Sequence, residues 1–308
     1  FENVKAVVPQ TGVETVAVAG IADFLSPLKG FLGKLFKKIP VGKVSPIPGI
    51  TVGRFMNLLQ KMPSDFVEEQ VNPDARCLMQ YTGGTTGVAK GAMLTHRNMV
   101  ANMLQAKAWL GNLEVGSEVI VTALPLYHIF ALTANCLVFM ALGGRNLLVT
   151  NPRDMPGFVK ELARTPLTAI TGVNTLFNSL LNTEGFEAVD FSRLKLVLGG
   201  GMAVQRAVAE RWKEVTGVTL VEAYGLTETS PAACINPMDL EEYNGCIGLP
   251  ISSTEAAILG DEGGWLPPGE VGELCIRGPQ VMKGYWRRPE ATAEVLDEDG
   301  WLHTGDVA

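Results

Sequence analysis

From Arg76 to Cys234, short apolar runs alternate with longer stretches in which apolar residues recur at helical spacing. This alternation is typical of a parallel β-sheet with helices on its faces, because two parallel strands need a crossover connection, which is usually a helix. Strands are predicted at Cys77–Tyr81, Val119–Leu124, Asn146–Val149, Ala169–Thr171, Leu194–Leu198 and Thr219–Ala223. Helices are predicted at Arg97–Trp109, with Thr95 as the capping residue, and at Ile129–Leu142, Pro156–Ala163, Asn174–Leu181 and Ala203–Val215.

The pattern changes after about Cys234. From Gly245 onward, Gly and Pro residues separate short β-type runs such as Glu255–Leu259 and Glu273–Arg277. The sequence therefore predicts an α/β fold in which a mostly parallel sheet flanked by helices is followed by a small β-barrel-like subdomain. The predicted boundaries are residues 1–75 for an N-terminal segment, 76–234 for the α/β subdomain and 235–308 for the β subdomain.

The composition excludes several classes of protein. With 308 residues and 47% apolar side chains, the chain can bury a sizeable core, which excludes a disordered protein and a miniprotein held by disulfides. The net charge of −7 argues against nucleic-acid binding, because phosphate contacts need a basic surface. The five cysteines form no C-x-x-C pair of the kind that binds zinc, so we expect a reduced, cytoplasmic compartment.

A basic amphipathic helix is predicted over residues 24–39. Residues 1–50 carry six lysines against three acidic residues. Ser26-Pro27 has the form of a helix N-terminus, and apolar residues follow at Leu28, Phe31, Leu32, Leu35, Phe36 and Ile39. Such a helix either lies peripherally on the anionic inner face of a membrane or docks on the protein's own surface, and the sequence leaves both interpretations open.

The longest uncharged stretch of the chain is Ile129–Gly144, which contains Thr133 and Asn135. It is shorter than the roughly 20 apolar residues that a membrane-spanning helix needs. We therefore interpret it as a buried helix.

The strongest candidate for a binding site is a loop rich in Gly and Thr that follows the first predicted strand. It contains Thr82, Gly83, Gly84, Thr85, Thr86, Gly87, Val88, Ala89, Lys90 and Gly91. Backbone N–H groups, hydroxyls and a cation are the groups that bind a polyphosphate. The loop fits neither the Walker pattern nor the dinucleotide pattern G-x-G-x-x-G. We expect it to bind phosphates and to lead from the strand into the helix capped by Thr95.

Three further segments carry candidate nucleotide contacts. The run Tyr224–Glu228 follows a predicted strand, where open α/β sheets bind their ligands, and offers an aromatic ring and a carboxylate. The run Gly199–Met202 follows the preceding strand and allows a flat ligand to approach the backbone closely. The run Thr304–Asp306 supplies a carboxylate suited to ribose hydroxyls.

These segments, together with Pro125-Leu126-Tyr127-His128, resemble the successive core motifs of the adenylate-forming enzymes, which include acyl- and aryl-CoA synthetases, luciferases and the adenylation domains of peptide synthetases. The resemblance extends from about Cys77 to Ala308. Within this superfamily, Gln80–Asn98, Ala123–Leu132 and Gly278–Trp286 are most similar to bacterial long-chain fatty-acid–CoA ligases.

The resemblance implies a reaction in two steps. A fatty carboxylate attacks the α-phosphorus of ATP to give acyl-AMP and pyrophosphate, and the thiol of CoA then displaces AMP. The implied catalytic residues are Lys90, Thr85, Glu228 and His128, with Mg²⁺ bound by Thr85 and Glu228. The implied ATP and AMP contacts are Thr82, Gly83, Gly84, Thr85, Thr86, Gly87, Lys90, Gly200, Gly201, Met202, Tyr224, Gly225, Thr227, Glu228 and Asp306.

The residue after Tyr127 indicates the class of acid. Amino-acid-activating relatives have an Asp there that binds the substrate ammonium, whereas this chain has His128. The implied acyl pocket is formed by His128, Leu132, Gly172 and Val173, although His128 is alternatively a histidine packed in the core. We expect a long-chain fatty acid; an aryl- or medium-chain acyl-CoA ligase stays an alternative, because an apolar pocket discriminates chain length only weakly.

The family pattern begins before Phe1 and continues beyond Ala308. In relatives, the Thr-Gly-Asp motif is followed by an Arg, a hinge residue and a mobile C-terminal domain that carries a lysine needed for adenylation. We therefore expect a large-domain fragment, in which residues 1–75 are a remnant and the C-terminal domain is absent, with little or no ligase activity of its own. A non-catalytic fragment that binds adenylate or fatty acid is a second interpretation, and the sequence leaves open a monomer or a homodimer.

Overall fold

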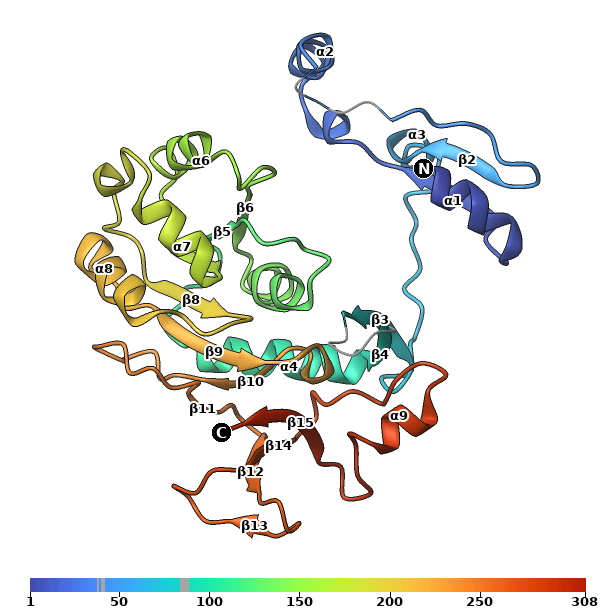
Figure 1. Cartoon of the computed structure of the whole chain (residues 1–308). Coiled ribbons are helices and arrows are strands. Elements are labelled where there is room, and N and C mark those ends of the chain that lie inside the picture. The colour runs from blue at the N-terminus through green and yellow to red at the C-terminus, as the bar shows by residue number, and fades with distance from the viewer. Residues whose placement is uncertain (38, 40–41, 84–88) are drawn as a thin grey trace. The chain divides into compact units, whose positions relative to one another are not determined.

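The structure is a computed structural model that describes residues 1–37, 39, 42–83 and 89–308. The chain divides into two compact units, Phe1–Gln70 and Val71–Ala308. The second unit contains the predicted α/β sheet and the segments that follow it (Figure 1).

The first unit contains a small parallel sheet and short helices. Its elements are α1 (Glu2–Val7), η1 (Val8–Gln10), β1 (Thr15–Val18), η2 (Ile21–Phe24), α2 (Pro27–Leu35), β2 (Thr51–Arg54) and α3 (Phe55–Leu59). Helix α2 begins with Pro27 at its first position, as the sequence predicts. Its apolar residues Leu28, Phe31 and Leu35 are between 60% and 67% exposed. The amphipathic helix is therefore present, and its apolar face is exposed within this unit.

The second unit is built on a sheet whose strands follow the order β11-β10-β9-β8-β7-β5-β6. Five neighbouring strands of this sheet are parallel: β5 (Val119–Thr122), β6 (Arg145–Leu148), β7 (Ala169–Gly172), β8 (Leu196–Gly200) and β9 (Val221–Gly225). At one edge, β10 (Ala232–Ile235) and β11 (Leu249–Pro250) add antiparallel strands. The mostly parallel sheet predicted from the sequence is confirmed.

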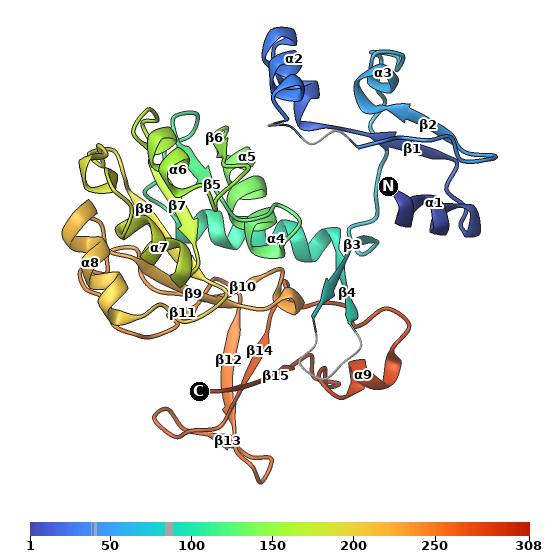
Figure 2. The same ribbon diagram turned by 45° about the horizontal axis from the view of Figure 1, so that its top comes forward.

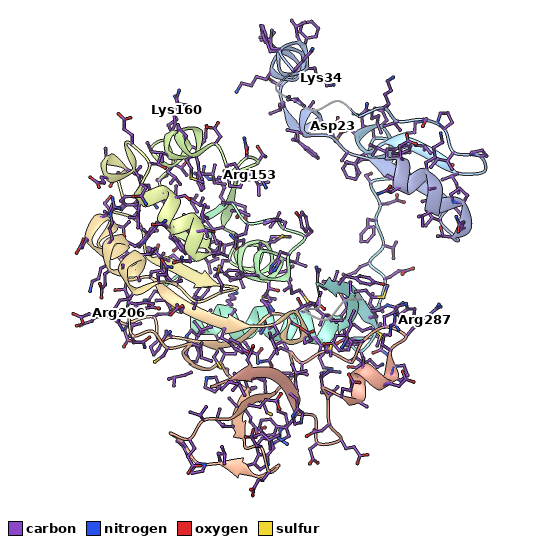
Figure 3. All side chains as sticks on the ribbon, in the orientation of Figure 1. Asp23, Lys34, Arg153, Lys160, Arg206 and Arg287 are labelled. Atoms are coloured by element: carbon purple, nitrogen blue, oxygen red, sulfur yellow. The ribbon has the colours of Figure 1, made fainter. Side chains whose placement is uncertain are left out.

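Helices cover both faces of this sheet (Figure 2). They are α4 (His96–Trp109), the π-helical η3 (Ala131–Leu137), α5 (Val138–Ala141), α6 (Met155–Leu162), α7 (Asn174–Leu181), the short η4 (Phe186–Ala188) and α8 (Arg206–Thr216). Side chains alternate along each strand: Val121 and Val197 pack with α6, α7 and α8, whereas Ile120 and Leu196 pack with α4, η3 and α5. Charged side chains such as Lys160 and Arg206 extend from the outer surface (Figure 3).

The stretch predicted as a buried helix forms η3 and α5. Its polar residues are buried and bonded: the Thr133 hydroxyl donates to the Ser230 carbonyl (2.7 Å), and the Asn135 amide donates to Thr122 (3.1 Å). The described residues include no helix that is both long and apolar enough to span a membrane.

One prediction about the sheet is wrong. The predicted strand at Cys77–Tyr81 corresponds to β3 (Arg76–Thr82), which pairs antiparallel with β4 (Lys90–Thr95) in a separate hairpin and does not join the large sheet. Only residues 83–89 separate the two strands, and a connection that short returns the chain antiparallel. The Gly- and Thr-rich segment Thr82–Gly91, called the phosphate loop below, therefore connects two strands, and helix α4 begins only after the second strand.

The small β subdomain is a four-stranded antiparallel sheet with the order β13-β12-β14-β15. Its strands are β12 (Glu255–Leu259), β13 (Trp265–Leu266), β14 (Glu273–Arg277) and β15 (Leu302–Val307). In the part of the chain that is described, no pairing joins β13 to β15, so the expected barrel-like subdomain is an open sheet. The short helices η5 (Thr227–Thr229) and α9 (Pro289–Ala293) complete the second unit.

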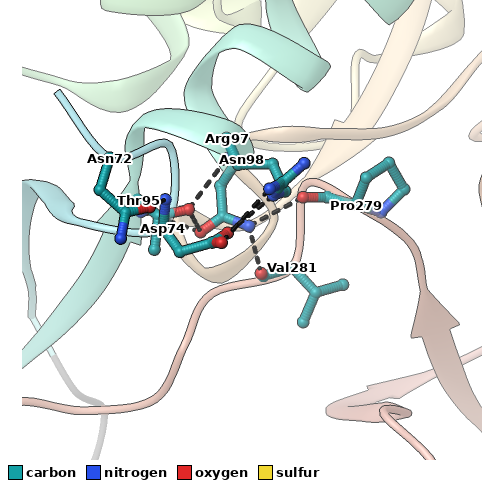
Figure 4. Close-up of polar contacts among 7 residues, drawn as sticks. All are labelled: Asn72, Asp74, Thr95, Arg97, Asn98, Pro279 and Val281. Carbon is teal, nitrogen blue, oxygen red and sulfur yellow. Dashed lines mark hydrogen bonds and ion pairs between the residues drawn. The ribbon is translucent and has the colours of Figure 1, made fainter. Parts of the chain in front are cut away.

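Helix α4 presents amide side chains on its buried face. The predicted cap is confirmed, because the Thr95 hydroxyl accepts a hydrogen bond from the backbone N–H of Asn98 (3.1 Å). The Asn98 side chain donates to the carbonyls of Pro279 and Val281, both at 2.8 Å (Figure 4). One and two turns further along, Asn102 bonds to both backbone groups of Ala232 in β10 and the Gln105 amide donates to the carbonyl of Ser252 (2.6 Å).

At the end of the sheet where the parallel strands begin, a buried acid is paired with a lysine. Glu118 is 1% exposed, and its carboxylate accepts hydrogen bonds from Lys195 Nζ (2.8 Å) and from the backbone N–H of Glu114 (2.7 Å). Burial raises the pKa of Glu118, but these hydrogen bonds outweigh it and leave the pKa below its usual value. The pair joins the beginnings of β5 and β8.

We predict that Asn102→Leu lowers the free energy of unfolding by roughly 2–4 kcal/mol, because it leaves two buried backbone groups of Ala232 without partners. Urea denaturation measures this difference. As a control, the exposed Asn112→Leu is expected to change stability by less than about 0.5 kcal/mol. Equal effects of the two variants would contradict a structural role for the Asn102 amide.

We predict that Lys195→Met lowers stability at pH 7 by about 2–3 kcal/mol, since it leaves the Glu118 carboxylate buried without its partner. A carboxyl whose pKa is depressed by folding stabilises the protein above its unfolded pKa of about 4.3, and this contribution disappears as the pH falls through the folded pKa. The difference between wild type and variant should therefore shrink below about pH 4. Urea denaturation at several pH values tests this, with the exposed Lys160→Met as control. A difference that does not depend on pH would refute it.

Candidate functional site

The loops that follow the parallel strands meet at one edge of the sheet, and a cavity of about 540 Å³ opens there. This is the edge at which open α/β sheets bind ligands. The cavity is lined by Thr82, Gly83, Lys90, Ala106, Leu110, His128, Ile129, Phe130, Thr133, Ala134, Leu198, Gly200, Gly201, Ala223, Tyr224, Gly225, Leu226, Thr227, Glu228, Pro231, Ala232, Ile235, Tyr285, Val295 and Thr304. These residues come from six segments that are separate in sequence: the β3–β4 hairpin, the end of α4, residues 128–134, the end of β8, the end of β9 with β10, and residues 285–304.

Two glycines give the cavity its shape. A Cβ at Gly225 would lie 1.9 Å from the carbonyl oxygen of Pro231, so only glycine allows β9 to approach the chain that returns as β10. Gly201 has a φ of +78°, which favours glycine, and turns the chain away from the end of β8. Gly200 and Gly201 line the cavity beside Tyr224, as expected for a surface that binds a flat ligand.

The phosphate loop contributes its two ends to the cavity. Thr82, Gly83 and Lys90 line it, and the Thr82 hydroxyl donates to the Lys90 carbonyl (3.4 Å). Gly84, Thr85, Thr86 and Gly87 lie outside the described residues. The described part of the loop therefore brings one cation and one hydroxyl to the cavity.

Glu228, on η5 directly after β9, also lines the cavity. The Tyr285 hydroxyl donates to its Oε1 (2.7 Å), and the Lys90 ammonium lies over the Tyr285 ring, 5.1 Å from the centroid. Burial and the hydrogen bond to Glu228 raise the pKa of Tyr285, so its hydroxyl keeps its proton near neutral pH. The basic and acidic groups expected to contact a nucleotide therefore meet around one aromatic ring.

The donors fit Mg²⁺, the metal that the family resemblance implies. Mg²⁺ is usually bound through one or two carboxylates together with substrate phosphates, and it retains several waters. Glu228 supplies a carboxylate in the cavity, and its hydrogen bond to Tyr285 uses Oε1, so Oε2 would be the oxygen that holds the metal. The second expected ligand, Thr85, lies outside the described residues.

The two residues expected to contact adenine and ribose are brought together. The Tyr224 hydroxyl donates to Asp306 Oδ2 at 2.6 Å, across the gap between β9 and β15. Burial and this hydrogen bond raise the pKa of Tyr224, which therefore remains a donor. The neighbouring Thr304 and Thr227 line the cavity, while Asp306 itself is exposed at its edge.

The expected acyl-pocket residues separate into two groups. His128 is exposed and lines the cavity, so the alternative of a histidine packed in the core does not hold. Leu132 packs on the core cluster that contains Ala92, and Gly172 sits so close to Phe177 that a Cβ would lie 2.9 Å from its ring. Val173 packs against the core beside α7. Leu132, Gly172 and Val173 do not line the cavity.

Of the described residues, two expected nucleotide contacts are not among those that line the cavity: Met202, which is 55% exposed, and Asp306, which is hydrogen-bonded to the lining residue Tyr224. The apolar part of the cavity is formed instead by residues that the sequence analysis did not assign to the site. These are Ala106, Leu110, Ile129, Phe130, Ala134, Leu198 and Ile235. Their common signal is their place on the inner faces of α4, η3 and the sheet, which only the packed structure brings to one point.

Tyr285 is the functional candidate that the sequence analysis missed. The run Gly278–Trp286 was singled out for its family likeness, but its one charged residue is Lys283, and the partners of Tyr285 lie 57 and 195 positions earlier in the chain. A buried tyrosine needs a partner for its hydroxyl, and that requirement is the one signal that pointed toward a polar site.

Comparison with known proteins agrees with this geometry. The sequence model of the family described as "AMP-binding enzyme" matches residues 11–286. The chain is 53% identical over 311 residues to a long-chain-fatty-acid–CoA ligase of Escherichia coli O6:H1 and 54% identical over 312 residues to one of Salmonella typhimurium, covering 99% of this chain and 55% of each relative. The crystal structure of ATP-bound MatB from Rhodopseudomonas palustris superposes with a TM-score of 0.78 at 26% identity, covering 99% of this chain and 58% of that one. The chain spans about half the length of the curated relatives it matches. It belongs to the AMP-binding enzyme family.

Proposed function

We propose that this chain forms the nucleotide- and acyl-binding part of an ATP-dependent long-chain fatty-acid–CoA ligase. In this proposal, residues 76–234 supply the phosphate loop and the acyl site, and residues 235–308 supply the ribose contact. The observation that carries the proposal is a single cavity with a charged end at Lys90 and Glu228 and an apolar end at Ala106 and Leu110. A fatty acyl-adenylate also has one charged and one apolar end, with phosphate at the first and an alkyl chain at the second.

The charged end fits the phosphates of ATP. Lys90 and the amides of the phosphate loop would neutralise the β- and γ-phosphates, and Mg²⁺ on Glu228 and Thr85 would stabilise the charge on the departing pyrophosphate. Tyr224 and Gly200–Gly201 would flank adenine, and Asp306 would exchange its hydrogen bond to Tyr224 for the ribose hydroxyls.

The apolar end fits an alkyl chain. Its walls are Ala106 of α4, Leu110 directly after this helix, Phe130 and Ala134, and Leu198 of β8. None of these side chains offers a charge to an amine or a second carboxylate, and burial of each methylene is worth about 0.8 kcal/mol. A long alkyl acid therefore gains more from this surface than a short or polar one.

The first chemical step joins the two ends. A carboxylate oxygen of the fatty acid attacks the α-phosphorus, the bond from this phosphorus to the bridging oxygen breaks, pyrophosphate leaves, and the mixed anhydride acyl-AMP remains. His128 Nδ1 accepts a hydrogen bond from the backbone N–H of Phe130 (3.3 Å), so the neutral ring carries its proton on Nε2. From there it would donate to the acyl carboxylate and orient it. In the second step the CoA thiolate attacks the acyl carbonyl and AMP leaves.

Two alternatives remain testable with the same chain. An aryl- or medium-chain acyl-CoA ligase would use the same charged end but would prefer flat or short acids. A binding fragment without catalysis would bind the adenylate and release no pyrophosphate.

We predict that Mg²⁺ with non-hydrolysable acyl-adenylates raises the melting temperature of this chain, and that the shift grows from acetyl to palmitoyl. A ligand at a hundredfold excess over Kd stabilises the native state by about 2.7 kcal/mol. Differential scanning fluorimetry measures the series, with an aryl-adenylate and GTP for comparison. A larger shift with the aryl-adenylate would favour the aryl ligase, and a GTP shift equal to the adenylate shifts would contradict an adenylate site.

We predict that Ala106→Leu, which adds bulk at the apolar end, removes most of the dependence on chain length and leaves the shift with AMP unchanged. Ala108→Leu on the same helix, at a position that does not line the cavity, is the matched control. If both variants keep the wild-type dependence on alkyl length, the acyl chain does not occupy this end of the cavity.

We also propose that residues 24–39 hold the protein peripherally on the cytoplasmic face of an anionic membrane. The exposed apolar residues of α2, including Phe31 at 64%, together with Lys29 and Lys34, support this proposal. Lys34 extends from the helix in Figure 3. A membrane contact would also bring the cavity near its lipid-derived substrate.

We predict that Lys29→Gln with Lys34→Gln weakens binding to anionic lipid vesicles by about thirtyfold, since each of the two lysines near such a surface contributes on the order of 1 kcal/mol. Vesicle sedimentation measures the binding. The control is Lys5→Gln with Lys61→Gln, which removes the same charge from exposed positions of the same unit. Equal weakening in both pairs would mean that net charge, and not this helix, governs binding.

A further inference from the structure

The segment Gly278–Trp286 is hydrogen-bonded both to strand β4, which follows the phosphate loop, and to the turn that carries Glu228. Its backbone runs beside β4: Met93 donates to the carbonyl of Gly284 (2.9 Å) and accepts from Lys283 (3.0 Å). One residue before this pairing, the N–H of Met282 donates to the backbone carbonyl of Glu228 (2.7 Å). The segment is therefore bonded on one side to the strand that begins at Lys90 and on the other side to the residue expected to bind Mg²⁺.

The segment is itself fixed to helix α4. The Asn98 side-chain amide donates to two of its carbonyls, at Pro279 and Val281 (Figure 4), and the Ser230 hydroxyl donates to the carbonyl of Gln280 (2.8 Å). Gln280 is fully buried. The position of the segment is thus determined on both sides by buried hydrogen bonds.

Tyr285 extends from this segment into the cavity and is 8% exposed. Its hydroxyl donates to Glu228 Oε1 (2.7 Å), and its ring centroid lies 5.1 Å from Lys90 Nζ. Among the residues that the structure describes, no ion pair joins Lys90 to Glu228. One side chain therefore contacts both charged groups and separates them.

We propose that Tyr285 is a positioning residue that holds the Lys90 ammonium and the Glu228 carboxylate apart and oriented, so that the two groups receive the phosphates and the Mg²⁺ of one nucleotide. This inference rests on the proposed function, because it assigns the two charges to the same bound Mg-nucleotide. It adds a residue from a remote segment to the phosphate end of the site.

The chemistry of each contact supports this role. Opposite charges on flexible side chains tend to pair, and a direct pair would occupy the groups that the nucleotide needs. A cation over an aromatic face is held weakly enough to move to a phosphate. A phenol that donates to one carboxylate oxygen orients the other toward a metal, as outer partners of metal ligands do.

Two substitutions separate the contributions of the ring and the hydroxyl. Tyr285→Phe keeps the ring under Lys90 and removes the donor to Glu228, whereas Tyr285→Leu removes both. Tyr243→Phe is the matched control, because its partly buried hydroxyl donates to the carbonyl of Val204 and Tyr243 does not line the cavity. Titration calorimetry of the 308-residue chain with ATP at increasing Mg²⁺ gives both the ATP affinity and the half-saturating Mg²⁺ concentration.

For Tyr285→Phe we expect the half-saturating Mg²⁺ concentration to rise about tenfold, the lower end of the effect of losing an outer partner of a metal ligand. Tyr285→Leu should additionally weaken ATP binding at saturating Mg²⁺. Binding of AMP, which lacks the β- and γ-phosphates, should stay within about twofold in both variants, and this also shows that they are folded. Tyr243→Phe should match wild type throughout.

The inference is overturned if wild type binds Mg-ATP and Tyr285→Phe does so with the same Mg²⁺ dependence. It is also overturned if the variants lose AMP and ATP binding in proportion, because that result means a general structural role. If wild type binds neither ATP nor AMP at any Mg²⁺ concentration, the proposed function fails and the inference fails with it.

Discussion

Three amide side chains on the buried face of helix α4 hold the second unit together. Asn98, Asn102 and Gln105 lie one turn apart and bond to backbone groups of three different segments: the run that leads to Tyr285, strand β10, and the chain before β12. Buried amides of this kind must be fully bonded, because an unpaired polar group in the core is costly. The helix thus has a polar inner face at the places where an apolar one would be expected, and it fixes the sheet, the hairpin and the small β subdomain to each other.

The hydrogen bonds made by these amides of α4 determine which side chains meet in the cavity. Its charged end combines Lys90 from the hairpin with Glu228 from the sheet edge, and its far wall comes from Ala106 on the same helix α4 and Leu110 directly after it. The Tyr224 hydrogen bond to Asp306 (2.6 Å) joins the sheet edge to the small β subdomain in the same region. A cavity with one charged and one apolar end is thereby assembled from segments whose relative positions depend on α4.

Much of this fold can be predicted from the sequence, because strands buried on both faces and amphipathic helices carry strong apolar patterns. Helix α7 has the predicted bounds, and β8 and β9 each begin and end two residues later than predicted, since both strands continue to a glycine. The pairing of β3 with β4 was not predicted, since its apolar pattern suits either kind of sheet and only the short loop indicates a hairpin. The β12–β15 sheet was predicted as barrel-like because short β runs do not reveal whether a sheet closes.

The residues of the candidate site could likewise be predicted only in part. Motif residues adjacent to strand ends, such as Glu228 and Tyr224, could be assigned because the ends of parallel strands meet at one edge. Residues on helix faces could not be assigned. The role of Ala106 depends on how α4 packs, and that of Tyr285 depends on contacts with residues 57 and 195 positions away.

The most direct test of the account is to find where the end of the acyl chain lies. A palmitoyl-adenylate analogue with a photoreactive group at its terminal carbon would be bound to the chain with Mg²⁺, irradiated, and the labelled residues identified by mass spectrometry. Labelling concentrated on Ala106, Leu110 and Ala134, and suppressed by an excess of unlabelled palmitoyl-adenylate but not by GTP, is the predicted result. Labelling spread over the surface, or confined to residues 1–70, would contradict the claim that one cavity binds both the nucleotide and the fatty acyl group.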